Sequence, residues 1–348
     1  MQKIKLPFLM LSLILLSQWL QAEDYTLKHE VKRFIHQMHT QYHFKTSYLQ
    51  KLFQSVKKDP QAPIQTTACT AASHACKSKA QGSWDIYSRL HLEHNQTDLG
   101  VAFISEHYEL FQKAFQEYGV APEYIAAIIG IESYYGHNTG RYYVFDTLTH
   151  LAFDSSSRRK HYFRYELQEF LRMCYREQVE PRAIKGSKYG AIGMAQFMPS
   201  NYDKLAVDFN GDGKIRISSA ADAIGSIANY FKAHGWKNDE PVTTRVTYEG
   251  NRFEGLKTGL KHRYYRRYLP GIYPKEGTFD YDDKVMLIKL ERERYDELWY
   301  GAQNFYVLSR YNHSDYYAMA VHQLAQNIKT AYLAKYQQEQ TKQLYALK

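Results

Sequence analysis

The sequence predicts a mainly α-helical fold with a small strand-containing region, an α+β arrangement. Apolar residues recur at helical spacing in six segments, at 31–57, 98–118, 122–135, 161–179, 219–234 and 314–337. Between Glu240 and Glu291 the pattern changes to Thr-, Val- and Tyr-rich pieces interrupted by Gly and Pro, which is typical of short strands. The chain has 348 residues, of which 44% are hydrophobic, so it can bury a large core.

The N-terminus has the layout of a secretory signal. Lys3 and Lys5 precede an apolar run from Leu6 to Leu20, and Ala22 follows as a small residue suited to cleavage. The run spans 15 residues, whereas roughly 20 are needed to cross a bilayer. We therefore expect cleavage after Ala22 rather than an uncleaved anchor, and we expect residues 23–348 to be exported as a periplasmic or secreted protein. No cysteine lies near this site, so lipid attachment there is not expected.

The chain is basic with or without this signal. Removing residues 1–22 takes away two lysines and leaves 43 Lys and Arg against 36 Asp and Glu, a net charge of +7. Such a balance favours acidic partners, for example nucleic acid, anionic lipid or an anionic cell-wall polymer. The sequence has no helix-turn-helix signature, zinc-finger spacing or RNA-binding aromatic motif, and export disfavours nucleic acid further.

A polar, Ala- and Ser-rich insert extends from Pro60 to Ser83. It contains Cys69 and Cys76, which can close a short disulfide loop in an oxidising compartment or remain two free thiols. Cys174 lies in a helical pattern and is expected to be a small buried hydrophobe. No motif pairs these thiols with a histidine, so none is expected to be catalytic. The polar end of the chain, 337–348, is compatible with a helix and is expected to be a frayed extension.

Glu132 is the residue that most needs an explanation. Pro122 and Glu123 predict a helix start, because Pro suits the first turn and an acid lies beside the positive end of the helix dipole. The helix that follows is almost entirely apolar, so it carries the Glu132 carboxyl to the end of a buried segment. Burial raises the pKa of a carboxyl, as a general acid near neutral pH requires. The structural alternative is a buried Glu tied to an Arg or to a backbone amide.

A glycine-rich segment, 185–202, is the second candidate for chemistry. Gly186, Gly190 and Gly193 permit close approach to the main chain, and Gln196 offers both a donor and an acceptor among small and apolar neighbours. No Gly-Lys-Ser/Thr closes the segment, so it is not a phosphate-binding loop. The segment can hold a substrate close to the backbone.

The segment that begins at Asp208 is similar to an EF-hand calcium loop. Oxygen-bearing side chains occupy positions 1, 3 and 5, and a glycine occupies position 6. Ser219 replaces the usual Glu at position 12, and a carboxylate at position 15 is expected to complete the site. The expected calcium ligands are Asp208, Asn210, Asp212, the backbone carbonyl of Lys214, and Asp222. The alternative is an Asx-rich turn without metal, in which Asp222 only serves the helix N-terminus.

Together these segments resemble the membrane-bound lytic murein transglycosylase B family, bacterial enzymes that cleave peptidoglycan. The resemblance runs from about Val31 to Gln323, interrupted by the insert. It rests on ordered motifs at Ile129 to Gly136, Gly190 to Pro199, Val207 to Gly213, Ala228 to Trp236 and Arg310 to Ser314. One departure is Ser133-Tyr-Tyr, where a Thr-Arg-Trp-like run is expected.

The resemblance implies a lysozyme-like helical core in which Glu132 is the sole catalytic acid and base. Glu132 first protonates the glycosidic oxygen between N-acetylmuramic acid and N-acetylglucosamine. It then accepts the proton of the muramic acid 6-hydroxyl while that oxygen attacks C1, which forms a 1,6-anhydro product without water. The resemblance also implies a saccharide groove lined by Tyr87, Arg158, Arg159, Ser187, Gln196, Tyr230, Tyr311 and Tyr317. For the tyrosines, an ordinary core position is the alternative.

Two other functions compete with lytic transglycosylation. A muramidase hydrolyses the same bond with water, and a non-catalytic wall-binding protein retains the groove without turnover. A calcium-dependent interaction protein is a third possibility, with no affinity for sugar. For the transglycosylase, the muramidase and the wall-binding protein, the expected partner is a peptidoglycan glycan strand. We expect the protein to be a monomer with structural calcium and no organic cofactor. No membrane span is expected after signal removal. Cell-wall machinery that recruits the enzyme is a further expected class of partner.

Overall fold

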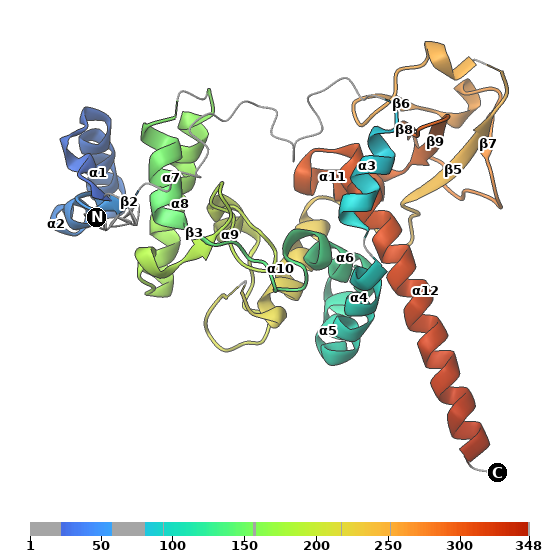
Figure 1. Ribbon diagram of the computed structural model, residues 1–348, viewed down its shortest axis with the longest axis horizontal. Helices are drawn as coiled ribbons and strands as arrows, with labels where there is room; N and C mark the ends of the chain where they lie inside the picture. The colour runs from blue at the N-terminus through green and yellow to red at the C-terminus, as the bar shows by residue number, and fades with distance from the viewer. Residues whose placement is uncertain are drawn as a thin grey trace, which may run out of the picture. The chain divides into compact units, whose positions relative to one another are not determined.

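The structure is a computed structural model, whose helices and strands are labelled in Figure 1. The chain divides into two compact units, Met1–Ala62 and Pro63–Lys348. It describes residues 22–57, 81–92, 94–155, 158–216, 218–250 and 252–346. The expected signal, apart from its last residue, lies outside these ranges, as do Cys69 and Cys76. Cys174 is buried and carries a free thiol.

The described part of the first unit contains a pair of short strands and two helices. Its elements are β1 (Ala22–Glu23), α1 (His29–Tyr42), α2 (Thr46–Phe53) and β2 (Val56–Lys57), and β1 pairs antiparallel with β2. The sequence pattern predicted one helix over 31–57, and that prediction was wrong. The backbone becomes left-handed at His43, with φ of 60°, which ends α1. Apolar spacing continues across this break because both helices bury one face.

The second unit is mainly helical. Its helices in chain order are α3 (Ser83–His91), α4 (His94–Glu106), α5 (Tyr108–Tyr118), α6 (Pro122–Ser133), α7 (Val144–Phe153), α8 (Lys160–Glu177), α9 (Pro199–Leu205), α10 (Ala220–Ala233), α11 (Gln303–Asn312) and α12 (Asp315–Ala346). The single helix predicted over 98–118 is two helices, because the backbone leaves the helical region at His107. The sequence pattern did not predict α3, α7, α9 or α11.

Helix α6 is largely buried. Ile125, Ile128 and Ile129 have no exposed surface, and α4, α5, α10 and α12 pack against the helix. Helix α12 continues to Ala346, well past the start of the expected frayed extension at residue 337. Within the described ranges, no helix combines the length and the apolar character that crossing a membrane requires.

A five-stranded antiparallel sheet forms the strand-containing region. Its strands are β5 (Thr243–Tyr248), β6 (Arg263–Tyr264), β7 (Ile272–Pro274), β8 (Val285–Glu291) and β9 (Asp296–Gly301), in the order β6-β8-β9-β5-β7. The region therefore extends ten residues past the expected end at Glu291, because β9 pairs with both β8 and β5. Buried Leu287, Leu298 and Tyr300 form part of its own core. The predicted fold class, mainly helical with a small strand-containing region, is confirmed.

Candidate active site

The C-terminal end of α6 presents Glu132. Pro122 stands in the first turn and Glu123 beside it, as the sequence predicted, while Ala121 supplies the extended backbone that precedes the helix. The helix ends at Ser133, after which Tyr134 and Tyr135 adopt left-handed conformations with φ of 51° and 56°. A carboxylate in the last turn of a helix faces the negative end of the dipole, which disfavours its charge.

Glu132 is partly buried, and its carboxyl accepts a hydrogen bond from a distant helix. The Tyr317 hydroxyl, on α12, donates to Glu132 Oε1 at 2.6 Å. Withdrawal from solvent raises the pKa of Glu132 to about 7, and the hydrogen bond from Tyr317 opposes that rise. Both protonation states of this carboxyl are therefore populated near neutral pH, which allows one residue to act first as an acid and then as a base.

Tyrosines from other helices surround this carboxyl. Burial, with the nearby charge of Glu132 as a second cause, raises the pKa of Tyr87, Tyr311 and Tyr317. The pKa of Tyr230 rises to about 12, chiefly because it is buried and in part because of Glu132. These phenols remain protonated at neutral pH, so they can donate hydrogen bonds and carry no charge that competes with the carboxylate.

Ring contacts hold the tyrosines in place. Tyr311 stacks on Tyr317 with centroids 6.3 Å apart and an interplanar angle of 12°, and its ring lies 4.8 Å from that of Tyr230. Phe197 contacts both Tyr230 and Tyr311. The cluster joins α10, α11 and α12 to the glycine-rich segment, so each ring is fixed by two or more elements.

The glycine-rich segment packs against the chain that follows α6. A Cβ at Gly140 would lie 2.1 Å from the carbonyl group of Gly186, and a Cβ at Gly186 would lie 2.2 Å from the carbonyl oxygen of Ala191, so neither residue tolerates a side chain. Gln196 has a left-handed backbone with φ of 47°, and its Nε2 donates to the carbonyl oxygens of Thr139 (3.1 Å) and Gly193 (2.8 Å). Both of these bonds use the amide nitrogen, which leaves the side-chain oxygen as an acceptor.

Three further hydrogen bonds shape the segment. Ser187 Oγ accepts hydrogen bonds from the amides of Tyr189 (3.3 Å) and Ala191 (3.0 Å), so its proton can be donated elsewhere. The Tyr311 hydroxyl donates to the carbonyl oxygen of Ala195 at 2.5 Å. This last bond connects the segment that carries Gln196 directly to the aromatic cluster.

Arg158 and Arg159 stand apart from this group. Both are exposed at the N-terminal end of α8, and the Arg159 guanidinium lies over the rings of Tyr162 (4.8 Å) and Phe163 (5.2 Å). Both of these cation–π contacts are with residues of α8, the helix that Arg159 precedes. The structure brings Tyr87, Tyr230, Tyr311 and Tyr317 together around Glu132, while the place of the two arginines in the groove stays a prediction.

Two members of the aromatic cluster were missed in the sequence. Phe197 bridges two tyrosines, and the His234 ring stacks on Tyr230 at 4.0 Å. Phe197 directly follows Gln196, and its place in the same motif was the available signal. His234 directly follows the end of α10, one turn after Tyr230, and an aromatic pair at helical spacing was the signal.

The loop that begins at Asp208 is closed by its own side chains. Asp208 Oδ1 accepts from the amides of Gly211 (2.9 Å) and Asp212 (3.1 Å), and Asp208 Oδ2 accepts from that of Gly213 (2.7 Å). Asn210 and Asp212 also accept loop amides, and a hydrogen bond from Arg216 lowers the pKa of Asp212. Two carboxylates and one amide oxygen on a tight loop form a donor set that suits calcium.

Asp222 has a different environment. It is fully buried, with Oδ1 accepting from the Phe209 amide at 2.9 Å and Oδ2 from the Arg216 amide at 2.6 Å. Each carboxylate oxygen of Asp222 therefore holds one end of the loop against α10. In the part of the chain that the structure describes, no group of three or more His, Cys, Asp or Glu residues is placed to hold a metal ion.

Several known proteins are similar to this chain in fold and in sequence. The chain is 36% identical to the membrane-bound lytic murein transglycosylase B of Escherichia coli (strain K12) over 311 residues, 88% of this chain and 85% of that protein. The structure matches the E. coli lytic transglycosylase Slt35 in complex with bulgecin A with a TM-score of 0.82 at 35% identity, covering 90% of this chain and 96% of the other. The soluble lytic transglycosylase SltB1 from Pseudomonas aeruginosa gives a TM-score of 0.77 at 37% identity, covering 87% and 99%.

The helical fold matches that of a lytic transglycosylase of known structure, and a carboxyl with a raised pKa stands at the end of a buried helix, so the protein is a lysozyme-like lytic transglycosylase. The transglycosylase SLT domain matches residues 26–326. The chain therefore belongs to the transglycosylase SLT domain family.

Proposed function

We propose that this enzyme cleaves the β-1,4 bond between N-acetylmuramic acid and N-acetylglucosamine in peptidoglycan and forms a 1,6-anhydro-muramic acid end. The observation that carries the proposal is the environment of Glu132. Burial and one tyrosine hydroxyl set its pKa near 7, and no second carboxylate contributes to that shift. A single acid and base suffices when the substrate supplies its own nucleophile.

The reaction proceeds in two proton transfers. Protonated Glu132 donates to the glycosidic oxygen as the bond from that oxygen to C1 of the muramic acid breaks. The resulting carboxylate accepts the proton of the 6-hydroxyl while its oxygen bonds to C1. Glu132 ends as it began, protonated, and no water is consumed. The internal hydroxyl replaces an enzyme nucleophile because it is held beside C1 by the sugar ring.

Neighbouring side chains supply a groove for the glycan. Ser187 and Gln196 offer a donor and an acceptor for N-acetyl and hydroxyl groups, and Tyr87, Tyr230 and Tyr311 offer ring faces or hydroxyl tips. Arg158 and Arg159 are proposed to meet lactyl or stem-peptide carboxylates as a strand extends beyond Glu132. A relative, SltB3 from Pseudomonas aeruginosa, has been solved with NAG-anhNAM-pentapeptide, with a TM-score of 0.72 at 26% identity, covering 86% of this chain and 78% of that chain.

The products of a digest of purified peptidoglycan test this function. We expect mass spectrometry to show muropeptides with anhydro ends, lighter by one water than the products of hydrolysis. A muramidase would release reducing ends instead. A wall-binding protein without turnover would sediment with sacculi and leave them intact, so either result would replace the proposed function.

Replacement of Tyr317 by Phe tests the proposed control of the Glu132 pKa. The hydrogen bond from Tyr317 lowers that pKa, so its loss raises it. A bond to a charged group contributes about 1.5 to 3 kcal/mol, which corresponds to a shift of roughly one unit or more. We expect the alkaline limb of the kcat/KM profile to move to higher pH by about that amount. The exposed Tyr273, replaced by Phe, is the matched control; an unshifted limb in Tyr317→Phe would remove Tyr317 from this role.

The loop at Asp208 is proposed to bind calcium that stabilises the fold. Its side-chain ligands are Asp208, Asn210 and Asp212, with the backbone carbonyl of Lys214, while Asp222 is the fifth residue proposed at the site. A relative supports this proposal, because the E. coli Slt35 structure has been solved in complex with calcium, at 35% identity and a TM-score of 0.81, covering 90% of this chain and 96% of the other.

The proposed mature enzyme is a single catalytic region, residues 23–348, exported by the signal at residues 1–22. It is proposed to act as a monomer on glycan strands in the periplasm or outside the cell, without an organic cofactor. Analysis of the N-terminus of the secreted protein tests the cleavage site, which we place after Ala22.

A further inference from the structure

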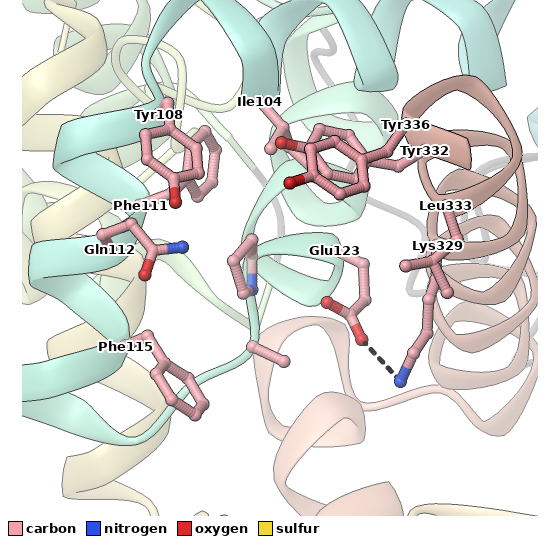
Figure 2. A pocket seen from close by; sticks show the side chains of 12 residues that line it. Ile104, Tyr108, Phe111, Gln112, Phe115, Glu123, Lys329, Tyr332, Leu333 and Tyr336 are labelled. Atoms are coloured by element: carbon pink, nitrogen blue, oxygen red, sulfur yellow. Dashed lines mark ion pairs between the residues drawn. The ribbon is translucent and has the colours of Figure 1, made fainter. Parts of the chain in front are cut away.

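A second cavity lies between α5, the start of α6 and the C-terminal half of α12. Its volume is about 520 Å³, within the range of roughly 300 to 1,000 Å³ typical of small-molecule sites. Figure 2 shows Tyr108 and Phe115 on one wall, and Tyr332 and Tyr336 on the opposite wall. None of its lining residues belongs to the cluster around Glu132, so it is a separate site.

Aromatic faces are accessible in this cavity. The exposed fractions of Tyr108, Phe115 and Tyr336 are 52%, 39% and 54%. These rings stand on two different helices, α5 and α12, so both walls present aromatic surface to a ligand. Tyrosine presents an apolar face together with a hydroxyl at its edge, which suits a ligand that is apolar on its faces and polar around its rim.

The polar groups of the cavity favour a neutral ligand. Among the described residues, the Gln112 amide and the hydroxyls of Tyr108 and Tyr336 make no hydrogen bond, so they are open to a ligand. Lys329 Nζ lies 3.4 Å from Glu123 Oε1, and this ion pair cancels the only two charges in the lining. An anionic ligand such as a stem-peptide carboxylate gains little here, whereas hydroxyl and N-acetyl groups find donors and acceptors.

One wall of the cavity lies outside the family domain. The transglycosylase SLT domain matches residues 26–326, and the α12 residues that line the cavity begin at Lys329. The cavity therefore depends on the part of α12 that follows residue 326.

We propose that this cavity is a second saccharide site, which binds an N-acetylhexosamine unit of a glycan strand while Glu132 acts on another part of the wall. The choice of glycan rests on the proposed function. Binding at two points holds the enzyme on its polymer between cleavage events, because the second contact forms at high effective concentration.

Binding to purified sacculi tests the site without turnover. In a Glu132→Gln background, Tyr108→Ala and Tyr336→Ala each remove one accessible ring from opposite walls. Loss of one aromatic contact of about 0.5 to 1.5 kcal/mol weakens binding by roughly twofold to tenfold. Tyr268→Ala removes an equally accessible ring, exposed to 65%, outside the cavity, and serves as the control. We expect the two cavity variants to sediment less with sacculi and the control to sediment like the parent.

A soluble chitotriose provides the second measurement. Ligand-observed NMR should show saturation transfer to its N-acetyl methyl groups that is reduced in Tyr108→Ala and Tyr336→Ala. Unchanged affinity of both folded variants for sacculi and for chitotriose would overturn the proposal. If the protein with Glu132 intact never cleaves sacculi yet loses binding in the cavity variants, the proposed function fails and the saccharide site stands.

Discussion

Glu132→Gln is expected to abolish turnover of peptidoglycan while preserving the fold. General acid–base catalysis contributes about a hundred- to ten-thousand-fold for one proton transfer, and Glu132 is proposed to carry out both transfers. Gln retains an oxygen that accepts the hydrogen bond from Tyr317 but cannot exchange a proton. We expect a loss of at least about a thousandfold in the release of anhydro-muropeptides. Glu109→Gln, an exposed change on α5, is the control for charge.

The stability of the same variant gives an independent check. The pKa of Glu132 is about 7 in the folded protein and 4.5 ordinarily, so the folded state binds this proton more tightly than the unfolded state. Stability from this group is therefore full below about pH 4.5 and is lost as pH rises to about 7. At 1.36 kcal/mol per unit the loss reaches about 3 kcal/mol at most, less for a partly exposed carboxyl.

Glu132→Gln lacks this titration, so its melting temperature should exceed that of the parent at pH 8 and match it more closely at pH 4.5. Thermal unfolding at the two pH values measures the difference. Equal stability at both values would show that burial does not perturb the carboxyl. Full activity of the variant would show that another group transfers the protons.

Asp222→Ala is expected to destabilise the protein with or without calcium. The buried carboxylate accepts hydrogen bonds from the amides of Phe209 and Arg216, and its removal leaves the buried Phe209 amide without a partner. Bonds to a charged acceptor contribute about 1.5 to 3 kcal/mol each, so we expect a loss of about 3 to 5 kcal/mol. Unfolding in urea with excess chelator measures it.

Asp208→Ala separates metal binding from loop closure. Asp208 bonds only to amides of an exposed loop, which water can satisfy after the substitution. We expect a loss below about 1 kcal/mol in chelator. Calcium at a hundred times its Kd should stabilise the parent by about 2.7 kcal/mol, and this gain should disappear in Asp208→Ala.

The calcium dependence of Asp222→Ala then defines the role of that residue. If the variant keeps the gain from calcium, Asp222 holds the loop by its amides and is not a ligand. If the variant is as stable as the parent in chelator and has lost the gain, Asp222 is a ligand. Asp239→Ala, an exposed change outside the loop, is the matched control.

The pattern of neighbouring residues in the sequence was sufficient to predict several features of the fold and of the candidate site. Pro122 at a helix start, the apolar length of α6 and the position of Glu132 at its end are properties of adjacent residues. Helical spacing also located α8 and α10 within one or two residues. Periodicity did not locate the breaks at His43 and His107, because two helices that bury the same side of the chain preserve the apolar spacing across a break.

The environment of Glu132 was decided by tertiary structure. Its partner Tyr317 lies 185 residues away in sequence, and the rings of Tyr230 and Tyr311 reach the site from two further helices. A family resemblance pointed to these tyrosines, but no local pattern states which of them donates to the carboxyl. The same holds for Asp222, whose bonds to both ends of the loop depend on the packing of α10.

The primary sequence alone determined the helical class, the glycine-rich and calcium-like loops, and the carboxyl to be explained. The tertiary structure determines the pKa of Glu132. It also places the end of α12 opposite α5, which forms the second cavity. The physical reason is the distance along the sequence over which each interaction acts. Helix starts, turns and apolar spacing depend on residues a few positions apart, whereas desolvation and cavity shape are sums over side chains that meet only when distant helices pack.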